Sequence, residues 1–390
     1  MLYRLFITLL WFGLTFLVIL PVLCHRLKYS IYYGGLRPRN ITQENLKMEE
    51  ENNQRLLMAH KEFRNIVTKN EIVGKPSNVT DIIITLITVS RGISDYNPYY
   101  LTQTASKLLQ LLRKDVTGLD FTYGLMVCNV DSLPNAYTEA KEISNLIYTT
   151  VKYTKRLNQV INRFEKEKQD YVYCLEKSLQ FQPRYVLLME DDAYPTDRML
   201  PVLEYSIQNV FQGKFSEFFH QQRKVAYLKL YHPERLLGFI SSEIYRLFEL
   251  AGAILLLVTF LIAVKKTCTS GITITRRFVI LTGVYIVFLA LAIGRPNLIG
   301  IRTVSPYFHS FVTAPSCCTP ANLYSYNGAR AVIDSVSHKV SYAGHAKDAL
   351  LDEFLKESDY NAIYVEPNIF KHIGQYSSLR HGIVLDPYVV

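Results

Sequence analysis

The sequence has little of several features that define specialised classes of protein. Six Cys in 390 residues are too few for a small domain held together by disulfides. Fifteen Pro and eighteen Gly exclude collagen and low-complexity linkers. Charged residues make up 20%, below the roughly 25% of soluble domains. Because 49% of the residues are hydrophobic, a disordered chain is excluded as well, and the length allows two domains, or one large domain with membrane segments.

The first long apolar run covers residues 5–24 and carries no charge. About twenty residues of helix span a hydrocarbon core of roughly 30 Å. A cleaved signal peptide is the alternative, but its apolar region is usually only about 7–15 residues long, and no small-residue cleavage site follows here. The sequence therefore predicts a retained signal anchor.

Two further apolar stretches lie close together, at 244–264 and 278–295. Lys265 and Lys266 end the first stretch, and Arg276 and Arg277 begin the second. A pair of buried core helices is the alternative, but the basic pairs face each other across a short loop. The pattern favours a transmembrane hairpin with a basic tip.

The charges of the loop at 265–277 predict its side of the membrane. Basic loops stay in the cytosol, so both outer ends of the hairpin are expected in the lumen. Arg26 and Lys28 after the first span argue weakly for the opposite orientation. Asn40 and Asn78 begin Asn-x-Thr triplets, which predict N-glycosylation on the lumenal side.

The rest of the chain alternates between strand and helix patterns. Apolar runs of strand length lie at 81–91, 121–130, 184–189, 225–231 and 362–365, and helical patterns lie at 101–112, 138–180 and 345–356. This alternation predicts an α/β fold with a mostly parallel central sheet.

The segments before and after the hairpin lack separate cores, so we expect one catalytic domain interrupted by the membrane insertion. The predicted layout is a cytosolic tail (1–4), the anchor (5–24), a lumenal stalk (25–80), the N-terminal segment of the catalytic domain (81–243), the second span (244–264), a cytosolic loop (265–277), the third span (278–295) and the C-terminal segment of the catalytic domain (296–390).

Three adjacent carboxylates, Glu190, Asp191 and Asp192, follow the apolar run 184–189. Ligands of open α/β sheets bind where strands end. A divalent cation would relieve the repulsion between the carboxylates, and oxygen ligands favour Mg²⁺ or Mn²⁺. The alternative is a solvated acidic turn. The position after a buried strand favours the metal site.

Two other predicted strands also end in polar residues. Val89, Ser90 and Arg91 end the first strand, and the planar donors of Arg91 suit a diphosphate, although a surface ion pair is an equal alternative. Asp131 closes the second strand. It is equally consistent with a contact to a base or ribose and with an ordinary turn.

Candidates for proton transfer and phosphate contact occur near the C-terminus. His372 is followed by Gly374 and a run of hydroxyl residues, which fits a close approach to phosphate. Asp348 and Asp352 are four residues apart and share one face of a predicted helix. Either carboxylate is a candidate general base, while Asp348 also suits a helix start, where it complements the dipole.

Several segments resemble a known family. The chain has an N-terminal anchor, "YVLLM" before the acidic triplet, "YLKLYHPERL", a membrane hairpin and "EPNIFKHIGQYSSLR". Together these are similar to the post-GPI-attachment N-acetylgalactosamine transferases of the Golgi, from about residue 80 onward. The family's metal motif is Asp-x-Asp, and Glu190 takes its first position here. "HIGQYSSL" also resembles N-acetylglucosaminyltransferase IV.

The resemblance implies a GT-A fold, UDP-GalNAc as donor, Mn²⁺ (or Mg²⁺) as cofactor and inverting transfer to the first mannose of a GPI glycan on protein. It implies a multi-pass protein of the Golgi membrane, with GPI-anchored proteins and the bilayer as partners. No nucleic-acid partner is expected, and the oligomeric state is open. By position, the roles are Glu190 and Asp192 for metal and diphosphate, Val89 and Asp131 for uridine, His372 for metal or phosphate, and Asp348, with Asp352 behind it, as base.

Other functions remain alternatives. The chain could be a Golgi UDP-sugar transferase acting on N-glycans, like N-acetylglucosaminyltransferase IV, or a non-catalytic lectin-like or escort protein. A glycosidase is disfavoured, because no two acids pair in the required way.

An oxidising lumen makes free thiols unexpected. Cys128 and Cys174 are candidates for a bridge between the second strand and the following helix. Cys317 and Cys318 are adjacent and either form a vicinal bridge or find separate partners. Connectivity cannot be deduced from spacing alone.

Overall fold

The computed structural model describes residues 2–34, 40–68, 76, 79–91, 96–114, 118–155, 162–213, 223–240, 243–268, 275–377 and 384–386. The chain divides into two compact units. Unit 1 comprises Met1–Asn40 and Pro233–Ile301, and unit 2 comprises Ile41–His232 and Arg302–Val390. The predicted glycosylation site Asn78 and residues 269–274 of the predicted cytosolic loop lie outside the described residues.

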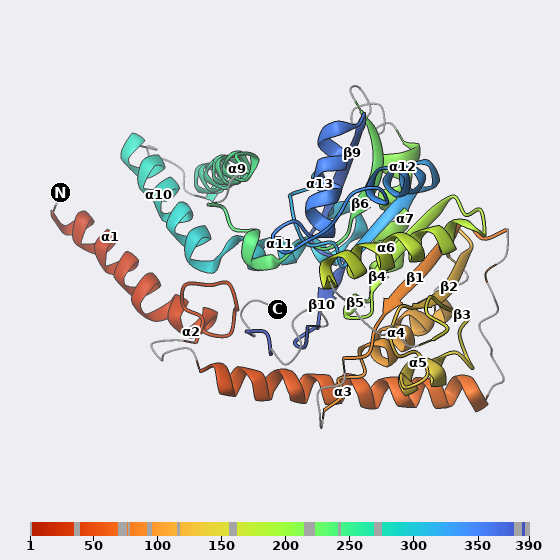
Figure 1. Ribbon diagram of the computed structural model, residues 1–390. Helices are drawn as coiled ribbons and strands as arrows, with labels where there is room; N and C mark the ends of the chain where they lie inside the picture. Colours follow the sequence, from red (N-terminus) through yellow and green to blue (C-terminus); the bar gives the residue numbers. More distant parts are fainter. Residues whose placement is uncertain are drawn as a thin grey trace. The chain divides into compact units, whose positions relative to one another are not determined.

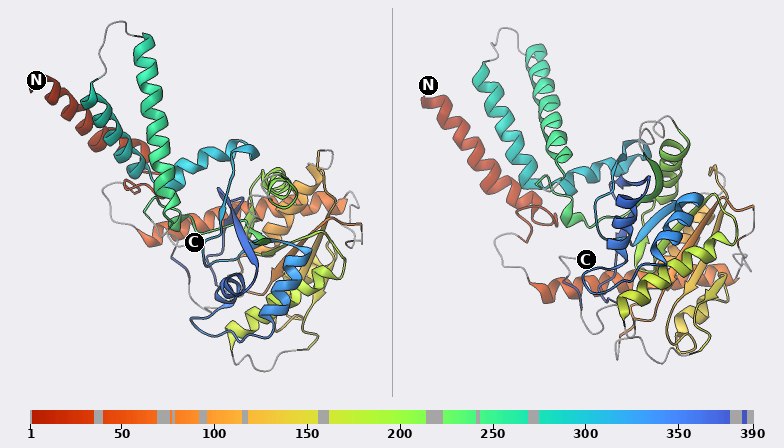
Figure 2. Two further views of the ribbon diagram at one scale, coloured as in Figure 1. Left: turned by 90° about the horizontal axis from the view of Figure 1, so that it is seen from above. Right: turned by 45° about the horizontal axis from the view of Figure 1, so that its top comes forward.

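Unit 1 is helical. Its elements are α1 (Leu2–Leu14), η1 (Thr15–Ile19), α2 (Leu20–Cys24), η3 (Glu234–Leu236), α9 (Tyr245–Cys268), α10 (Arg276–Ile293) and α11 (Arg295–Ile299), and η4 (Gly300–Val304) begins at its end. Within the described residues, three helical stretches are long and apolar enough to cross a membrane: Phe6–Cys24, Tyr245–Thr267 and Arg276–Ile293 (Figure 2). These stretches fit a membrane protein.

The N-terminal helices of unit 1 pack against α10. Thr15 and Tyr285 share a hydrogen bond of 2.9 Å between their hydroxyl oxygens, and the Phe16 ring lies edge-on to Tyr285. At the other end of α10, Ser30 Oγ donates to Ala292 O at 2.7 Å. The first apolar segment therefore joins a segment more than 250 residues later through specific polar contacts.

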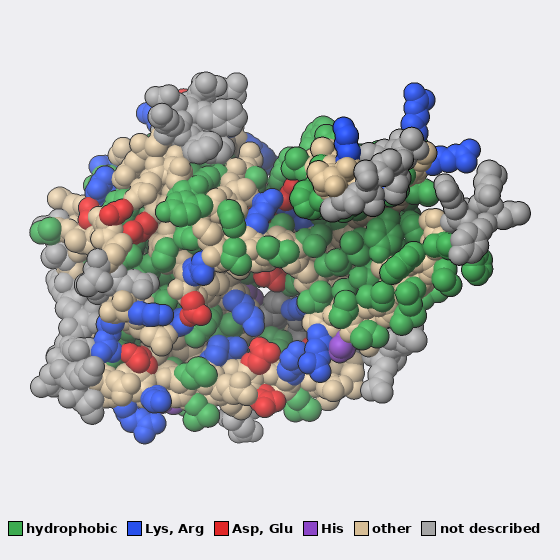
Figure 3. Space-filling model, turned by 180° about the vertical axis from the view of Figure 1, so that it is seen from behind, with side chains coloured by type: hydrophobic (Ala, Val, Ile, Leu, Met, Phe, Trp, Pro, Cys, Tyr) green, Lys and Arg blue, Asp and Glu red, His purple; other side chains and the backbone are tan. Residues whose placement is uncertain are grey.

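The outer faces of these helices are apolar and exposed. Leu17 is 78% exposed, Leu256 74% and Ile280 64%. Hydrophobic side chains cover this part of the molecule in the space-filling view (Figure 3). Apolar patches of this extent on a soluble protein would drive aggregation, whereas a bilayer satisfies them.

Unit 2 is built on an eight-stranded sheet in the order β3-β2-β1-β4-β8-β6-β9-β7 (Figure 1). The strands are β1 (Ile82–Thr88), β2 (Tyr123–Asn129), β3 (Thr149–Val151), β4 (Tyr185–Glu190), β6 (Lys224–Lys229), β7 (Ser310–Thr313), β8 (Ala321–Ser325) and β9 (Tyr360–Glu366). A separate antiparallel pair joins β5 (Ala193–Pro195) to β10 (Phe370–His372).

The sheet is parallel on the side that the first half of the chain builds. There β1 pairs in parallel with β2 and β4, and β2 pairs in parallel with β3. On the other side of β8, β6 pairs in parallel with β9. Strand β8 is antiparallel to both β4 and β6, and β7 is antiparallel to β9. Because β8 lies between β4 and β6, residues on both sides of the insertion at 233–301 share one sheet.

Helices cover both faces of the sheet. The remaining helical elements are α3 (Ile41–Thr68), α4 (Tyr100–Lys114), α5 (Thr138–Ile143), α6 (Arg163–Leu179), α7 (Met199–Ser206), η2 (Ile207–Gln212), η5 (Pro306–Phe308), α12 (Tyr326–Val336) and α13 (Lys347–Glu357). One core cluster joins the sheet to α4, α5 and α7, and the other joins it to α6, α12 and α13. This is a three-layer α/β architecture with a mixed, largely parallel sheet.

The structure adds to the sequence-based expectations in two places. Residues 138–180 are mostly helical, as expected, but the helix is interrupted: α5 ends at Ile143, and the short edge strand β3 precedes α6. Helix α12 was not foreseen, although its residues Ala329, Val332 and Val336 have helical spacing and are buried. Short polar stretches around each element hid these patterns from an interpretation based on hydrophobic periodicity.

The segment predicted as a stalk contains α3, a helix of 28 residues that packs on α4 within unit 2. Asn52 Nδ2 donates to Tyr96 Oη at 3.0 Å, and Gln103 Nε2 donates to Asn52 Oδ1 at 2.8 Å. Arg113 pairs with Glu62 at 2.7 Å. Polar contacts hold α3 on the unit, together with a few apolar residues such as Phe63 and Ile66.

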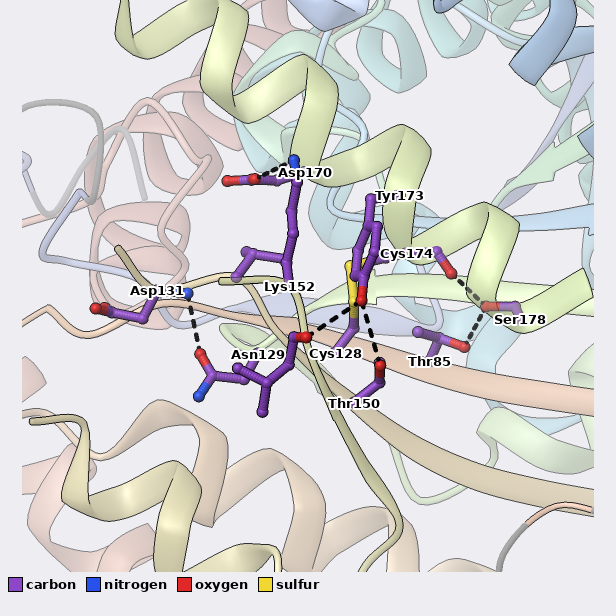
Figure 4. The surroundings of a disulfide bond; sticks show 12 residues. Thr85, Cys128, Asn129, Asp131, Thr150, Lys152, Asp170, Tyr173, Cys174 and Ser178 are labelled. Carbon is purple, nitrogen blue, oxygen red and sulfur yellow. Dashed lines mark hydrogen bonds and ion pairs between the residues drawn. A yellow bond between two sulfur atoms is a disulfide. The ribbon is translucent and has the colours of Figure 1, made fainter. Parts of the chain in front are cut away.

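A disulfide joins Cys128 of β2 to Cys174 of α6, the pair named from the sequence (Figure 4). Both residues are fully buried in the core cluster beneath α6, α12 and α13. Ser178, one turn further along α6, shares a 2.7 Å hydrogen bond with Thr85 of β1. The disulfide and the hydrogen bond fasten α6 to the parallel strands.

Removing this disulfide should destabilise unit 2. The Cys128→Ala/Cys174→Ala double variant opens a loop with a sequence separation of 46, which corresponds to about 2–4 kcal/mol of unfolding free energy. Thermal and denaturant unfolding in detergent measures the change. Each single variant should lose about as much as the double, because either one breaks the same bond. An unchanged unfolding midpoint would show that the bond is dispensable.

Candidate active site

The carboxyl ends of the parallel strands meet at one edge of the sheet. Strand β1 lies between β2 and β4, with Ile87 in register with both Cys128 and Glu190. The polar residues that follow these strands therefore come together, as the sequence predicted for such ends. A cavity of about 280 Å³ opens there. Its lining combines strand-end residues with residues of α6 and α13: Ile87, Val89, Ser90, Arg91, Val130, Asp131, Ser132, Arg163, Lys166, Glu167, Asp170, Tyr171, Glu190 and Lys347.

Arg91 neutralises two carboxylates of the acidic triplet. Its Nη1 donates to Asp192 Oδ2 at 2.7 Å, and its Nη2 pairs with Asp191 Oδ1. The guanidinium also lies over the Tyr100 ring, 5.2 Å from its centroid. The Arg91 side chain is only 10% exposed, so this is a buried ion pair rather than a surface one.

The two aspartates respond differently to this environment. Burial raises the pKa of Asp191 to about 6 against the opposing charge of Arg91. Burial also acts to raise the pKa of Asp192, but Arg91 and His372 together hold it well below its ordinary value. Asp192 is thus the firmly ionised member of the pair.

Asp192 lies beside the C-terminal segment. Pairing of β5 with β10 sets His372 opposite Ala193, and His372 Nε2 lies 3.4 Å from Asp192 Oδ2. Ile373 N donates to Asp192 O at 2.9 Å. Burial disfavours the charged form of His372, yet the Asp192 carboxylate raises the pKa of the imidazole overall.

Gly374 allows these two groups to lie close to the backbone. Asp192 Oδ1 is buried and has no hydrogen-bond partner among the described residues. A Cβ on Gly374 would lie 2.1 Å from Asp192 Oδ2 and 3.0 Å from His372 Nε2. A carboxylate oxygen without a partner and a neighbouring imidazole nitrogen are ligand types that fit a divalent cation.

Glu190 points to a different partner. Lys347 Nζ donates to Glu190 Oε1 at 2.5 Å and to Glu167 Oε1 at 2.7 Å. Within the described residues, no three His, Cys, Asp or Glu side chains are grouped as metal ligands. The fit to a metal therefore rests on Asp192 and His372, and a role for Glu190 as a ligand stays a prediction.

Asp131 is fixed at the end of β2 by backbone donors. Its Oδ2 accepts from Ser90 N at 2.7 Å, and its Oδ1 accepts from Leu133 N at 2.6 Å. Both Asp131 and Val89 line the cavity, on the side formed by β1 and β2. The structure brings together the two residues assigned to uridine.

The candidate bases lie on α13. Asp348 Oδ2 accepts from Cys318 N at 2.9 Å, and its Oδ1 accepts from Thr319 Oγ1 at 2.5 Å. Asp352 lies one turn further along and is half-buried. Neither lines the cavity, but Lys347, which directly precedes Asp348, does.

Sequence reasoning missed the wall of the cavity that α6 provides. Arg163, Lys166, Glu167 and Asp170 line it from one face of that helix. Their i, i+3 and i+4 spacing is the signal that could have found them, since such residues are neighbours on a helix. Figure 4 shows Asp170 paired with Lys152 near Asp131.

A buried chain of hydroxyls and carboxyls lies behind the acidic triplet. Thr88 Oγ1 lies 2.7 Å from both Asp191 Oδ2 and Tyr137 Oη. Tyr137 Oη donates to Glu139 Oε2 at 3.3 Å, and Thr102 N donates to Glu139 Oε1 at 2.7 Å. Burial raises the pKa of Glu139 to about 7.

Comparison with known proteins adds a family match. A family model described as "GPI-N-acetylgalactosamine transferase PGAP4" matches residues 82–371, which is most of the chain. The match begins at β1 and ends within β10, so it includes every cavity-lining residue.

Three solved structures show weak likeness. S. aureus TarS 1–349 is 10% identical with a TM-score of 0.31, and the match covers 73% of this chain and 60% of that one. The Pyrobaculum calidifontis mannosyltransferase PcManGT, in complex with GDP-Man and Mn²⁺, is 12% identical with a TM-score of 0.21, covering 50% and 48%. A CMP:2-keto-3-deoxy-manno-octonic acid synthetase complexed with CTP is 11% identical with a TM-score of 0.33, covering 74% and 93%.

The chain thus spans 60% and 48% of the lengths of the first two structures. TM-scores this low do not establish a shared fold, and these likenesses carry no weight for the chemistry.

The buried carboxyl Glu139 should make stability depend on pH. Its pKa is raised from 4.5 to about 7, so the folded state binds a proton more tightly than the unfolded chain does. Stability from this group is present below pH 4.5 and is lost as pH rises toward 7, on the order of 3 kcal/mol. Glu139→Gln, which mimics the protonated form, should flatten the slope.

Denaturant unfolding at several pH values between 4.5 and 8 measures this slope. The exposed Glu142→Gln variant on the same helix is the control and should follow the wild-type curve. If Glu139→Gln keeps the wild-type slope, the group that titrates lies elsewhere.

Proposed function

Because the chain belongs to the GPI-N-acetylgalactosamine transferase PGAP4 family and is therefore a glycosyltransferase, we propose that it transfers N-acetylgalactosamine from UDP-GalNAc to a GPI glycan. The proposed acceptor is the first mannose of a protein-attached GPI anchor, and the transfer inverts the anomeric centre. The observation that carries the proposal is the Asp192–His372 pair. Asp192 is bound by Arg91, which lines the strand-end cavity, and lies inside the matched residues, while His372 directly follows them.

The cavity is proposed to hold the donor nucleotide. Asp131, fixed by two backbone donors, offers its remaining lone pairs to the uracil or ribose, and Val89 packs beside them. Arg163, Lys166 and Lys347 line the same cavity and supply positive charge for a diphosphate. The three-layer unit with its mixed sheet supports a GT-A-like assignment.

Asp192 and His372 are the residues that would hold Mn²⁺ or Mg²⁺. Such an ion, when bound, neutralises negative charge on the departing diphosphate. Arg91 orients Asp192 through its Oδ2, and Oδ1 has no hydrogen-bond partner among the described residues. Glu190 stays oriented by Lys347 at the cavity wall.

Asp348 is the proposed general base, with Asp352 as the second candidate. The Cys318 amide and the Thr319 hydroxyl fix the orientation of the Asp348 carboxylate, and each of its oxygens keeps a lone pair. Oδ2 would accept the proton of the attacking mannose hydroxyl. Loss of a general base typically lowers the rate by about 10²–10⁴-fold.

The membrane helices suit the proposed acceptor. A GPI glycan is fixed to the membrane by its lipid, so an enzyme fixed to the same membrane meets it with less orientational freedom to lose. We propose the Golgi membrane as the location, with both halves of unit 2 lumenal, the loop 265–277 cytosolic, and α9 and α10 forming the transmembrane hairpin. The basic residues around that loop support this orientation.

The decisive experiment measures UDP release by the purified full-length protein with a panel of UDP-sugars, with and without Mn²⁺. We expect turnover with UDP-GalNAc and a GPI-glycan acceptor, and its loss with chelator. Asp192→Asn should lower turnover at least about 100-fold, because the loss of a metal ligand removes several kcal/mol of transition-state stabilisation. The exposed Asp197→Asn is the matched control.

Other outcomes of the same assay would redirect the proposal. Turnover with UDP-GlcNAc and an N-glycan would identify a transferase like N-acetylglucosaminyltransferase IV. Metal-independent turnover, or full activity of Asp192→Asn, would refute the role given to the Asp192–His372 pair.

Gly374→Ala tests the close packing of that pair against the backbone. The new Cβ would lie 2.1 Å from Asp192 Oδ2, so Asp192 and His372 must move apart. Displacement of about 1 Å in a catalytic site can lower the rate roughly 100-fold, and we expect a loss of this size. Gly118→Ala, where no atom lies within 4 Å of the new Cβ among the described residues, should stay active. Wild-type turnover by Gly374→Ala would mean that this close packing has no role.

A further inference from the structure

Two adjacent cysteines lie in the loop between β7 and β8. Cys317 Sγ and Cys318 Sγ are 2.7 Å apart, and both residues are half-buried. No disulfide joins them to each other or to another described cysteine. The other cysteines of unit 2 are Cys128 and Cys174, which are bonded to each other. Cys317 and Cys318 are therefore the two unbonded cysteines of unit 2.

The backbone of the pair is held in an uncommon conformation. Cys317 has φ 67° and Cys318 has φ 60°, in the left-handed region that residues other than Gly rarely adopt. Two consecutive residues of this kind persist only where their surroundings impose them. This backbone brings the two sulfur atoms together on one side of the loop.

Charged side chains hold the peptide group between the two cysteines from both sides. On one side, Cys318 N donates to Asp348 Oδ2 at 2.9 Å. On the other side, the buried Lys229 Nζ donates to Cys317 O and, at 2.8 Å, to Pro315 O. The loop is thus fixed from both α13 and β6.

The same contacts make the two sulfurs chemically different. The hydrogen bond from Cys318 lowers the pKa of the Cys317 thiol, and the Lys229 charge adds to this effect. The pKa of Cys318 is raised by the same hydrogen bond and by burial. A half-buried thiol of lowered pKa beside a second thiol of raised pKa suits thiol–disulfide exchange, in which the first thiol attacks as its thiolate.

We propose that Cys317 and Cys318 are a redox-modification site, a vicinal dithiol that a small-molecule disulfide such as glutathione disulfide converts reversibly into a vicinal disulfide. The Cys317 thiolate attacks one sulfur of the small disulfide and releases one thiolate. Cys318 then loses its proton, and its sulfur attacks Cys317 Sγ and releases the second thiolate. In total, two cysteine thiols and one disulfide give the protein disulfide and two small thiols, so the pair loses the two electrons that the small disulfide gains.

The site lies beside the strand-end cavity but does not rest on the proposed function. Pro320 O, two residues after Cys318, accepts from Glu190 N at 2.8 Å. Closing the ring must change the peptide group that Asp348 and Lys229 hold. Oxidation of the pair would therefore alter the hydrogen bonds that this loop makes with Glu190 of the acidic triplet and with Asp348 of α13.

The test is a redox titration of the purified full-length protein in glutathione buffers, followed by acid quenching, alkylation and mass spectrometry. As the oxidised fraction rises, the peptide with Cys317 and Cys318 should change from doubly alkylated to unalkylated with the loss of two hydrogen atoms. The change should reverse in reduced glutathione without unfolding. Cys128–Cys174, fully buried, is the internal control and should stay closed throughout.

Single variants test the order of attack. Cys318→Ser keeps a hydroxyl donor beside Cys317 and should form a mixed disulfide with glutathione at least about tenfold faster than Cys317→Ser does. Neither variant should give the closed form. Two unmodified thiols at every buffer ratio, separate glutathione groups on both cysteines, or a bridge that reduced glutathione never opens would each overturn the proposal.

Discussion

Asp191 and Asp192 lie side by side in the interior at the end of β4, where two negative charges are tolerated only with a cation between them. Arg91 supplies that cation from the end of β1, the neighbouring strand. Breaking a buried pair of this kind typically destabilises a protein by about 3–5 kcal/mol, because the remaining charge is left without a partner. The parallel pairing of β1 with β4 is what sets the guanidinium between the carboxylates, so sheet register and site electrostatics depend on each other.

The insertion at 233–301 interrupts the sequence of unit 2 without interrupting its sheet. After the insertion the chain returns to the middle of the sheet, where β8 pairs with β4 on one side and β6 on the other. A strand in this position must form for either half to complete its hydrogen bonding. Lys347 and His372, which complete the surroundings of Glu190 and Asp192, both come from this second segment.

Helix α3, in the segment before β1, also holds part of the candidate site in position. Gln375 Nε2 donates to Asn45 Oδ1 at 2.9 Å, and Tyr376 Oη donates to Glu49 Oε1 at 3.4 Å. These contacts fasten the residues directly after His372 and Gly374 to the helix. A polar segment with little hydrophobic periodicity thus stabilises the C-terminal side of the candidate site.

The sequence by itself determined the strands β1, β2 and β4, the apolar helices and the polar residues at strand ends, because burial on both faces and membrane-length runs leave continuous apolar patterns. It also indicated Asp192, His372 and the Cys128–Cys174 pair as candidates. Only the tertiary structure decided that Arg91 pairs with the triplet, that Lys347 binds Glu190, that α6 lines the cavity and that α3 packs on unit 2. Those contacts join residues far apart in the chain through hydrogen bonds and charges, and such interactions leave no periodic pattern in a single sequence.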